Sequence, residues 1–483
     1  MQPLMVAADP QGRIFEHPGL AMVGALGREP VAPQPEELSP LPAGSRLFTL
    51  PGSSPIGGEP EAGELVAVGE ADFGEGEVPL SAACTFPAPG WMRTLLPMAE
   101  REEGAAALPL WAYTALGFDE ESGGFVCAAV QVDDCPRWAP AAFDDRGLAG
   151  RVAEAGGRHP RNRLIPHLAR CAQEFHCFAA KNFFAGRWEI GLPIAPLCNA
   201  DCRGCISLQT DDLFPASHER ITFVPAPEEL CGIAAPHLEL AELAVASFGQ
   251  GCEGEPLLQA GVIERACRLI RERTGRGTLH LNTNGSRPEW ILRLAAAGLE
   301  SIRVSTNSVL PGWHRAYYRP ETYGFGEVED TVKAAVDAGL YTQLNYLVFP
   351  GVTDREAEAE ALLEFCGRTG LHVIQMKNLC MDPGLYLGLL PDLEEAGEAM
   401  GMAFLLDILR RELPGVALRY FNRPKEEWHL DPRAASRKMG SRVTLRVLPG
   451  DAPGGGGHRH PSGQPLGAPP PPKPPLRGAG EGG

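Results

Sequence analysis

The sequence predicts an α/β protein in which a partial (β/α)6 barrel of parallel strands follows a β-rich N-terminal domain and precedes a disordered C-terminal tail. Three observations predict this arrangement. Short alternating segments occupy residues 1–160, strands and amphipathic helices alternate from about residue 185, and glycine and proline dominate residues 450–483. Regular strand–helix alternation implies a parallel sheet that helices cover.

The N-terminal domain, residues 1–160, is predicted from short β-type segments separated by turn residues. Segments 47–50, 65–68 and 125–130 are rich in apolar residues, and the turn formers Pro-Gly-Ser-Ser-Pro at 51–55 separate the first two. Such segments bounded by glycine, proline and serine are typical of strands. The sequence does not indicate the role of this domain.

A connecting helix is expected over 161–184, where apolar residues recur at three- and four-residue spacing. The barrel is then expected over 185–400, and an α/β extension over 401–449. Six strands favour a partial barrel over a closed eight-stranded one. The expected strands are 188–194, 243–248, 278–282, 301–305, 342–349 and 372–376, with helices between them at 257–274, 288–297, 326–338 and 355–368.

The C-terminal tail, residues 450–483, has a composition that cannot bury a core. It carries four consecutive glycines, a His-Arg-His segment at 458–460 and a proline-rich run at 469–475. We expect it to be disordered and partly extended as polyproline. A solvated tail and a spacer explain these features better than a metal site or a peptide ligand.

The bulk composition is that of a globular protein with no membrane segment. Among 483 residues 44% are hydrophobic, and no apolar run reaches the length of a membrane span. The start of the chain lacks the pattern of a signal peptide, so a cytoplasmic location is the expectation. The net charge of −18 argues against a nucleic-acid-binding protein with a large basic surface.

Thirteen cysteines in a reducing compartment are not expected to pair mostly as disulfides. Cys198, Cys202 and Cys205 have the spacing C-x3-C-x2-C directly after the first barrel strand. Chance predicts only about 0.01 such triplets in a chain of this composition. Three thiolates can hold three corners of a [4Fe–4S] cluster and leave one iron open, which the amino and carboxylate groups of S-adenosylmethionine (SAM) can chelate.

On these residues the chain resembles the radical SAM superfamily over about residues 185–380. The resemblance implies a [4Fe–4S] cluster, SAM as cofactor, and reductive cleavage of SAM to a 5′-deoxyadenosyl radical that modifies a substrate. It also implies an electron donor such as flavodoxin or ferredoxin. One departure concerns Gly204, since the family usually has an aromatic residue just before the third cysteine; we expect that face of the cluster to be less shielded here.

Later strand ends extend the resemblance. Residues 248–256 resemble the family's Gly-Gly-Glu-Pro segment, whose backbone binds the amino group of SAM, and short polar ends in the family reach its ribose and carboxylate. Helix caps and Asx-turns are the alternative interpretation of these polar ends. Gln375 and Lys377 would face the substrate end. The expected SAM-binding residues are Gly254, Glu255, Pro256, Asn282, Asn284, Ser305, Asn307 and Asn345.

Cys252 and Cys380 are the candidate catalytic residues, because both follow barrel strands. Either could donate a hydrogen atom, carry a substrate covalently or ligate an auxiliary cluster, and a buried inert thiol is the alternative. No cysteine follows Cys380, which argues against a cysteine-rich C-terminal extension.

Two further questions stay open at the level of sequence. A structural zinc site could use the triplet with Cys252 as fourth ligand, in which case the chain would be a zinc-binding structural or interaction protein. Within the radical SAM interpretation, a peptide or protein, or a small metabolite, is favoured as substrate. RNA modification is the alternative, and the acidic charge counts against it.

Overall fold

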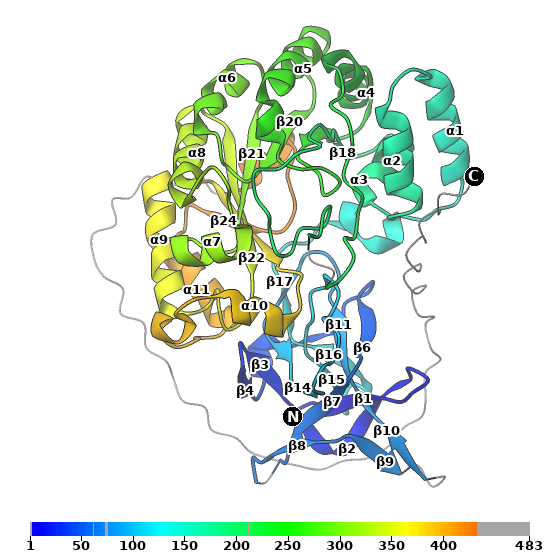
Figure 1. The fold of residues 1–483 in the computed structure, drawn as a ribbon, viewed down its shortest axis with the longest axis vertical. Helices are drawn as coiled ribbons and strands as arrows, with labels where there is room; N and C mark the ends of the chain where they lie inside the picture. The colour runs from blue at the N-terminus through cyan, green and yellow to red at the C-terminus, as the bar shows by residue number, and fades with distance from the viewer. Residues whose placement is uncertain (1, 61, 73–75, 211–212, 432–483) are drawn as a thin grey trace, which may run out of the picture.

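The computed structural model describes residues 2–60, 62–72, 76–210 and 213–431, and the expected tail at 450–483 lies outside these described residues. Figure 1 shows antiparallel strands at one end of the molecule and a helix-covered parallel sheet at the other. No helix among the described residues is both long and apolar enough to cross a bilayer.

The N-terminal part is β-rich, as predicted. Within the described residues, ten of its strands form one antiparallel sheet around small apolar clusters. The expected segments 47–50 and 65–68 fall in β6 and β8, and 125–130 is divided between β16 and β17. The strands are β1 Leu4–Ala8, β2 Ile14–Met22, β3 Gly24–Leu26, β4 Glu29–Val31, β5 Ser39–Pro40, β6 Arg46–Leu50, β7 Ser53–Gly58, β8 Leu65–Ala67, β9 Glu70–Asp72, β10 Glu77–Pro79, β11 Ser81–Phe86, β12 Trp91–Arg93, β13 Leu96–Pro97, β14 Ala99–Arg101, β15 Leu116–Asp119, β16 Gly124–Cys127 and β17 Ala129–Gln131.

The expected single connecting helix at 161–184 is wrong, because two short helices stand in its place and a third precedes them. They are α1 Leu148–Arg158, α2 Leu164–Gln173 and α3 Phe178–Ala185. Helix α2 ends where His176 adopts a left-handed backbone with φ of 52°, and the Cys177 N–H donates to the Cys171 carbonyl at 2.9 Å. The continuous apolar spacing of the sequence hides this break.

The parallel sheet contains all six expected strands in chain order and a seventh, β24, which comes from the region expected to be an extension. With only three residues, β24 is too short to show a periodicity. The strands are β18 Glu189–Gly191, β19 Val245–Phe248, β20 Thr278–Thr283, β21 Ser301–Thr306, β22 Tyr341–Val348, β23 Val373–Asn378 and β24 Ala417–Arg419. The helices are α4 Pro227–Leu240, α5 Ala260–Arg273, α6 Ile291–Ala296, α7 Pro311–Tyr318, α8 Phe325–Asp337, α9 Glu356–Thr369, α10 Pro383–Leu389 and α11 Met402–Glu412.

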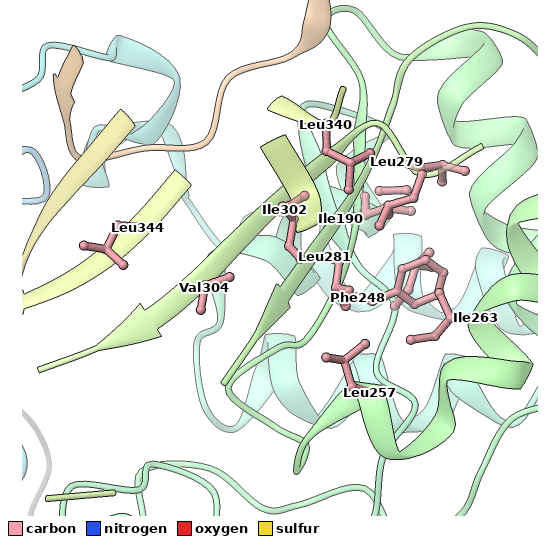
Figure 2. Close-up of a cluster of buried hydrophobic side chains, with 14 of the residues drawn as sticks. Ile190, Phe248, Leu257, Ile263, Leu279, Leu281, Ile302, Val304, Leu340 and Leu344 are labelled. Atoms are coloured by element: carbon pink, nitrogen blue, oxygen red, sulfur yellow. The ribbon is translucent and has the colours of Figure 1, made fainter. Parts of the chain in front are cut away.

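The two faces of this sheet differ because side chains alternate along each strand. Leu279 and Leu281 of β20 and Ile302 and Val304 of β21 are fully buried on the face that packs against the helices, where Ile263 of α5 meets them (Figure 2). The alternate residues are polar and form the other, inner face. The helices therefore cover the outside of the sheet, and the inside is left for polar groups.

The β-rich part is fixed to the carboxyl end of β23. Arg93 of β12 is fully buried, and its backbone N–H donates to Asn378 Oδ1 at 2.9 Å while Nη2 donates to the Leu379 carbonyl at 2.7 Å. Arg101 forms an ion pair with Asp382 at 2.7 Å. The N-terminal domain is thereby placed beside the sheet edge at which parallel α/β proteins carry out their chemistry.

Candidate metal centre

The three cysteines of the triplet lie in the loop that follows β18, and each is half-buried with a free thiol. Burial raises the pKa of Cys198 to about 11. Burial raises the pKa of Cys202 well above its ordinary value, and the neighbouring Cys198 and Cys205 thiolates raise it further. The three cysteines are thus close enough in the loop to influence one another's charge. Three soft thiolates in one loop are the donor set of an iron–sulfur cluster, so the residues fit that group.

The cysteine loop rests on the C-terminal end of α7 and the residue that follows it. The Arg203 N–H donates to the Tyr317 carbonyl at 3.0 Å, and Asp201 forms an ion pair with Arg319 at 2.9 Å. These contacts fix the loop on both sides of Cys202. These contacts hold the backbone of the cysteine loop against the end of α7.

Gly204 leaves room for an aromatic ring that comes from elsewhere in the chain. A Cβ atom on this residue would collide with the Tyr317 hydroxyl. Tyr317 is 4% exposed, and it packs with Tyr318 at a ring-centroid distance of 5.3 Å. The expectation that this face is less shielded is therefore wrong, because an aromatic residue from α7 fills the space.

Arg220 and Ser207 contact the third cysteine. Arg220 Nη2 donates to Cys205 Sγ at 3.5 Å and Nε donates to Ser207 Oγ at 3.1 Å. The Ser207 hydroxyl lies 3.6 Å from the same sulfur. A cation and a hydroxyl beside a thiolate stabilise negative charge there. Sequence reasoning missed both residues, since neither belongs to a spaced motif.

The loop after β19 packs directly against the cysteine loop. A Cβ atom on Gly254 would collide with the Leu197 carbonyl, so only glycine fits. The Gly254 N–H donates to the Ala195 carbonyl at 2.7 Å, and the Glu255 N–H donates to the Leu197 carbonyl at 3.0 Å. Pro256 follows and begins a short 3-10 helix. The two loops thus form one unit at the strand ends.

Two buried carboxylates hold this unit together. Glu253 accepts hydrogen bonds from the backbone N–H groups of Ile194 and Ala195, at 2.7 and 2.9 Å. These bonds draw the chain away from the sheet, which explains why β18 ends at Gly191 rather than at residue 194. Glu255 accepts from Thr283 Oγ1 and from the Asn284 N–H. Burial raises the pKa of each carboxyl to about 7.

Asn282 of β20 and Asn284, which follows that strand, donate hydrogen bonds to neighbouring loops. Asn282 Nδ2 donates to the Phe248 carbonyl at 3.0 Å, and Asn284 Nδ2 donates to Asn199 Oδ1 in the cysteine loop at 2.9 Å. Both asparagines are buried. Their amides therefore position the loops around the cysteines.

The polar residues of β21 and β22 lie further along the same edge. Asn345 Nδ2 donates to Ser305 Oγ at 2.9 Å, whereas Asn345 Oδ1 is buried without a hydrogen-bond partner among the described residues. Asn307 is 1% exposed and donates to the Tyr386 hydroxyl at 3.1 Å, towards α10. Asn307 Oδ1 is likewise buried without a partner among the described residues, so both asparagines have a free acceptor.

The inner face of the sheet carries two basic side chains. Arg303 Nη1 donates to Gln375 Oε1 at 3.0 Å, and its Nε is buried without a partner among the described residues. Lys377 Nζ lies 3.7 Å from the centroid of the Tyr420 ring. Burial lowers the pKa of Lys377 well below its ordinary value, and the Arg303 charge lowers it further. This face can therefore bind an anionic group.

The two remaining candidate cysteines occupy different surroundings. Cys380 is half-buried and donates to the Asn378 carbonyl at 3.4 Å, at the junction with the N-terminal domain. Cys252 is 4% exposed and lies beside Cys171 and His167 of α2. Hydrogen bonding from Cys252 lowers the pKa of the Cys171 thiol. The side chain of Cys252 is therefore engaged with the helices before the barrel.

Comparison with known proteins matches residues 192–363 to the family model described as the radical SAM superfamily. The chain is 33% identical over 108 residues to GTP 3′,8-cyclase of Heliobacterium modesticaldum, covering 21% of this chain and 31% of that protein. It is 24% identical over 237 residues to molybdenum cofactor biosynthesis protein 1 of Mus musculus, covering 49% of this chain and 34% of that protein. The chain thus spans about a third of the length of these relatives.

Two solved structures illustrate the structural likeness. HydG, a maturase of the [FeFe]-hydrogenase, matches with a TM-score of 0.35 at 14% identity, covering 57% of this chain and 66% of that one. Streptococcus suis SuiB bound to its precursor peptide SuiA matches with a TM-score of 0.35 at 11% identity, covering 64% of this chain and 69% of that one. By the family match, this chain carries a domain of the radical SAM superfamily, whose members use a [4Fe–4S] cluster and SAM.

Proposed function

We propose that this chain is an enzyme that reductively cleaves SAM at a [4Fe–4S] cluster held by Cys198, Cys202 and Cys205. The observation that carries the proposal is the position of three half-buried cysteines with free thiols in one loop at the carboxyl edge of the parallel sheet. When bound, the cluster and SAM supply one-electron cleavage of a carbon–sulfur bond, which gives methionine and a 5′-deoxyadenosyl radical.

The surrounding residues shape this site. Tyr317 covers one side of the cysteine loop, and Arg220 places a positive charge on Cys205. The Tyr317 ring excludes water from the cysteine loop. The Arg220 guanidinium stabilises negative charge on the thiolate. The protein contributes orientation and shielding, which is the usual role of a protein that houses a reactive cofactor.

Binding of SAM is assigned to the strand-end residues. The backbone of Gly254–Pro256 lies against the cysteine loop, where it can receive the amino group. Glu255, Asn282 and Asn284 hold the loops in place, and the other assigned residues are Ser305, Asn307 and Asn345. The Oδ1 atoms of Asn307 and Asn345 are buried without hydrogen-bond partners among the described residues, so either can accept from a ribose hydroxyl.

The substrate is proposed to carry an anionic group, as peptides and many metabolites do. Arg303 provides a positive charge on the inner face and Lys377 a buried amine that can take up a proton when an anion binds, with Glu189 as a nearby counter-charge. Cys380 lies close to this face and is the candidate hydrogen-atom donor. An external one-electron donor such as flavodoxin or ferredoxin is required to reduce the cluster.

The experiment is anaerobic reconstitution with iron and sulfide, reduction with dithionite, and mass spectrometry of the products formed from SAM. We expect about four iron atoms per chain, together with 5′-deoxyadenosine and methionine. Cys198→Ala, Cys202→Ala and Cys205→Ala should each remove the cluster and both products. Cys366→Ala, in α9 and 3% exposed, is the matched control that should retain both.

A colourless chain that binds zinc at the triplet and takes up no iron would contradict the proposal. The metal content of the triplet variants identifies this outcome, because zinc held by the triplet would be lost from all three. Products that persist in the triplet variants would also contradict it.

A further inference from the structure

A second cluster of metal-ligating side chains lies outside the cysteine loop. The ligand atoms of His167, Cys171 and Cys252 all lie within 4.8 Å of one another. Cys171 is 1% exposed and Cys252 is 4% exposed. A buried group of two sulfurs and one imidazole requires an explanation, because each of these groups is a good ligand for a transition metal.

The three side chains come from two elements that are distant in the sequence. His167 and Cys171 are four residues apart on α2 and lie on the same helix face, with Nε2 and Sγ separated by 3.7 Å. Cys252 follows β19. The separation of four residues on a helix is a geometry that places two ligands on one ion, and Cys252 brings a third ligand from the loop after β19.

A second histidine is available beside this group. His218 stacks on Phe175 with a ring-centroid distance of 5.5 Å, and its Nδ1 is buried without a hydrogen-bond partner among the described residues. Phe175 lines a pocket of ≈ 320 Å³ together with His167 and Cys171. An unpaired buried imidazole nitrogen next to such a pocket is available as a ligand.

The backbone brings His218 and Cys252 to this place. The His218 N–H donates to the Ile206 carbonyl at 2.8 Å, and the Ile221 N–H donates to the Cys252 carbonyl at 2.8 Å. The segment that carries His218 therefore runs along the loop that carries Cys252. This arrangement does not depend on a bound ion.

We propose that His167, Cys171 and Cys252, whose ligand atoms lie within 4.8 Å of one another, bind one structural Zn²⁺ ion, and that the His218 ring, which is not part of that group, moves in as the fourth ligand. Two sulfurs and two nitrogens form the tetrahedral donor set that selects zinc. Binding releases one proton from each cysteine thiol, and the two thiolates neutralise the ion. No oxidant or reductant takes part.

The site would connect α2 to the loop that receives SAM. Cys252 precedes Gly254 by two residues, and the Cys252 carbonyl is already bonded to the segment after the cysteine loop. A metal here fixes that loop from the side opposite the iron site. Cys252 is then a zinc ligand rather than a fourth ligand at the iron site, so the iron site keeps three cysteine ligands.

The test uses the full chain with Cys198, Cys202 and Cys205 all changed to alanine, so that no cluster forms and the proposed function plays no part. Purified from zinc-containing medium, it should hold about one zinc per chain by elemental mass spectrometry. Adding Cys171→Ser or Cys252→Ser should remove that zinc. Adding Cys267→Ser, a fully buried cysteine of α5, should not.

Cobalt provides a measurement that does not depend on the folding of the serine variants. Cobalt added to the metal-free triple-alanine chain should give the visible bands of tetrahedral cobalt and the charge-transfer absorption of thiolate ligands. His167→Ala should shift those bands. Three results would each overturn the proposal: absence of both metals, a Cys171–Cys252 disulfide in non-reducing mass spectrometry, or iron–sulfide absorption in the triple-alanine chain.

Discussion

The hydroxyl of Tyr317 occupies the space that a side chain on residue 204 would require. The radical SAM family usually places an aromatic residue at the position of Gly204, and this chain supplies the ring from α7 instead. The Arg203 N–H bonds to the Tyr317 carbonyl at 3.0 Å, so the two positions are also joined through the backbone. Gly204 thus leaves the space that the Tyr317 ring fills, and the ring covers this side of the cysteine loop.

This relationship predicts that Gly204→Phe alone prevents normal cluster assembly, because the new ring collides with Tyr317. Gly204→Phe combined with Tyr317→Gly should recover much of the lost iron, because the new ring then fills the vacated space. The measurement is iron and sulfide per chain after reconstitution. Equal loss in the single and double variants would show that the two positions do not share this space.

Arg220 should control the reduction potential of the cluster rather than its assembly. Its guanidinium donates to Cys205 Sγ at 3.5 Å, and a cation there favours the reduced, more negative cluster. Arg220→Met should therefore keep about four iron atoms and lower the potential. A contact worth about 1 kcal/mol corresponds to about 40 mV.

The potential is measured by redox titration followed with EPR. Arg220→Lys, which retains the charge, is the control and should shift the potential less than methionine does. An unchanged potential in Arg220→Met would remove the proposed electrostatic role of this residue.

The sequence was sufficient for the sheet and the cysteine loop because both are local patterns. Strand–helix alternation and the spacing of Cys198, Cys202 and Cys205 need no knowledge of distant contacts. Tyr317, Arg220 and the pairing of Cys171 with Cys252 could not be predicted, since tertiary packing alone brings them together. The break between α2 and α3 was missed for a different reason: apolar spacing continues through it.

Glu255 is predicted to stabilise the fold as well as the SAM site. Its buried carboxylate accepts from the Leu257 N–H, Thr283 Oγ1 and the Asn284 N–H. Glu255→Ala leaves these donors without a partner and should lower the free energy of unfolding by about 2 to 4 kcal/mol. Urea denaturation measures the loss. Glu360→Ala, on the exposed surface of α9, should change it by less than about 0.5 kcal/mol.

His280 should make the protein less stable in acid. Its side chain is 1% exposed, with Nδ1 at 2.9 Å from Ser301 Oγ and Nε2 at 2.9 Å from Asn282 Oδ1. Burial lowers its pKa from 6.5 to about 3. Between these values the unfolded chain binds a proton that the folded chain does not, so the stability present above pH 6.5 is lost as the pH falls towards 3.

The size of this effect follows from the pKa difference. Below pH 6.5 the contribution of His280 should fall by about 1.4 kcal/mol for each pH unit. His280→Gln keeps a polar side chain that does not titrate. Glu253 and Glu255 are present in both proteins, so their contributions cancel when the unfolding free energy of the variant is subtracted from that of the native chain. Urea denaturation at pH 7.5, 6 and 5 (values chosen to span roughly the upper half of the window) measures the difference. If that difference stays constant with pH, His280 takes up a proton in the folded chain as readily as in the unfolded chain. The inference that it stays neutral and hydrogen-bonded in the fold would then be wrong.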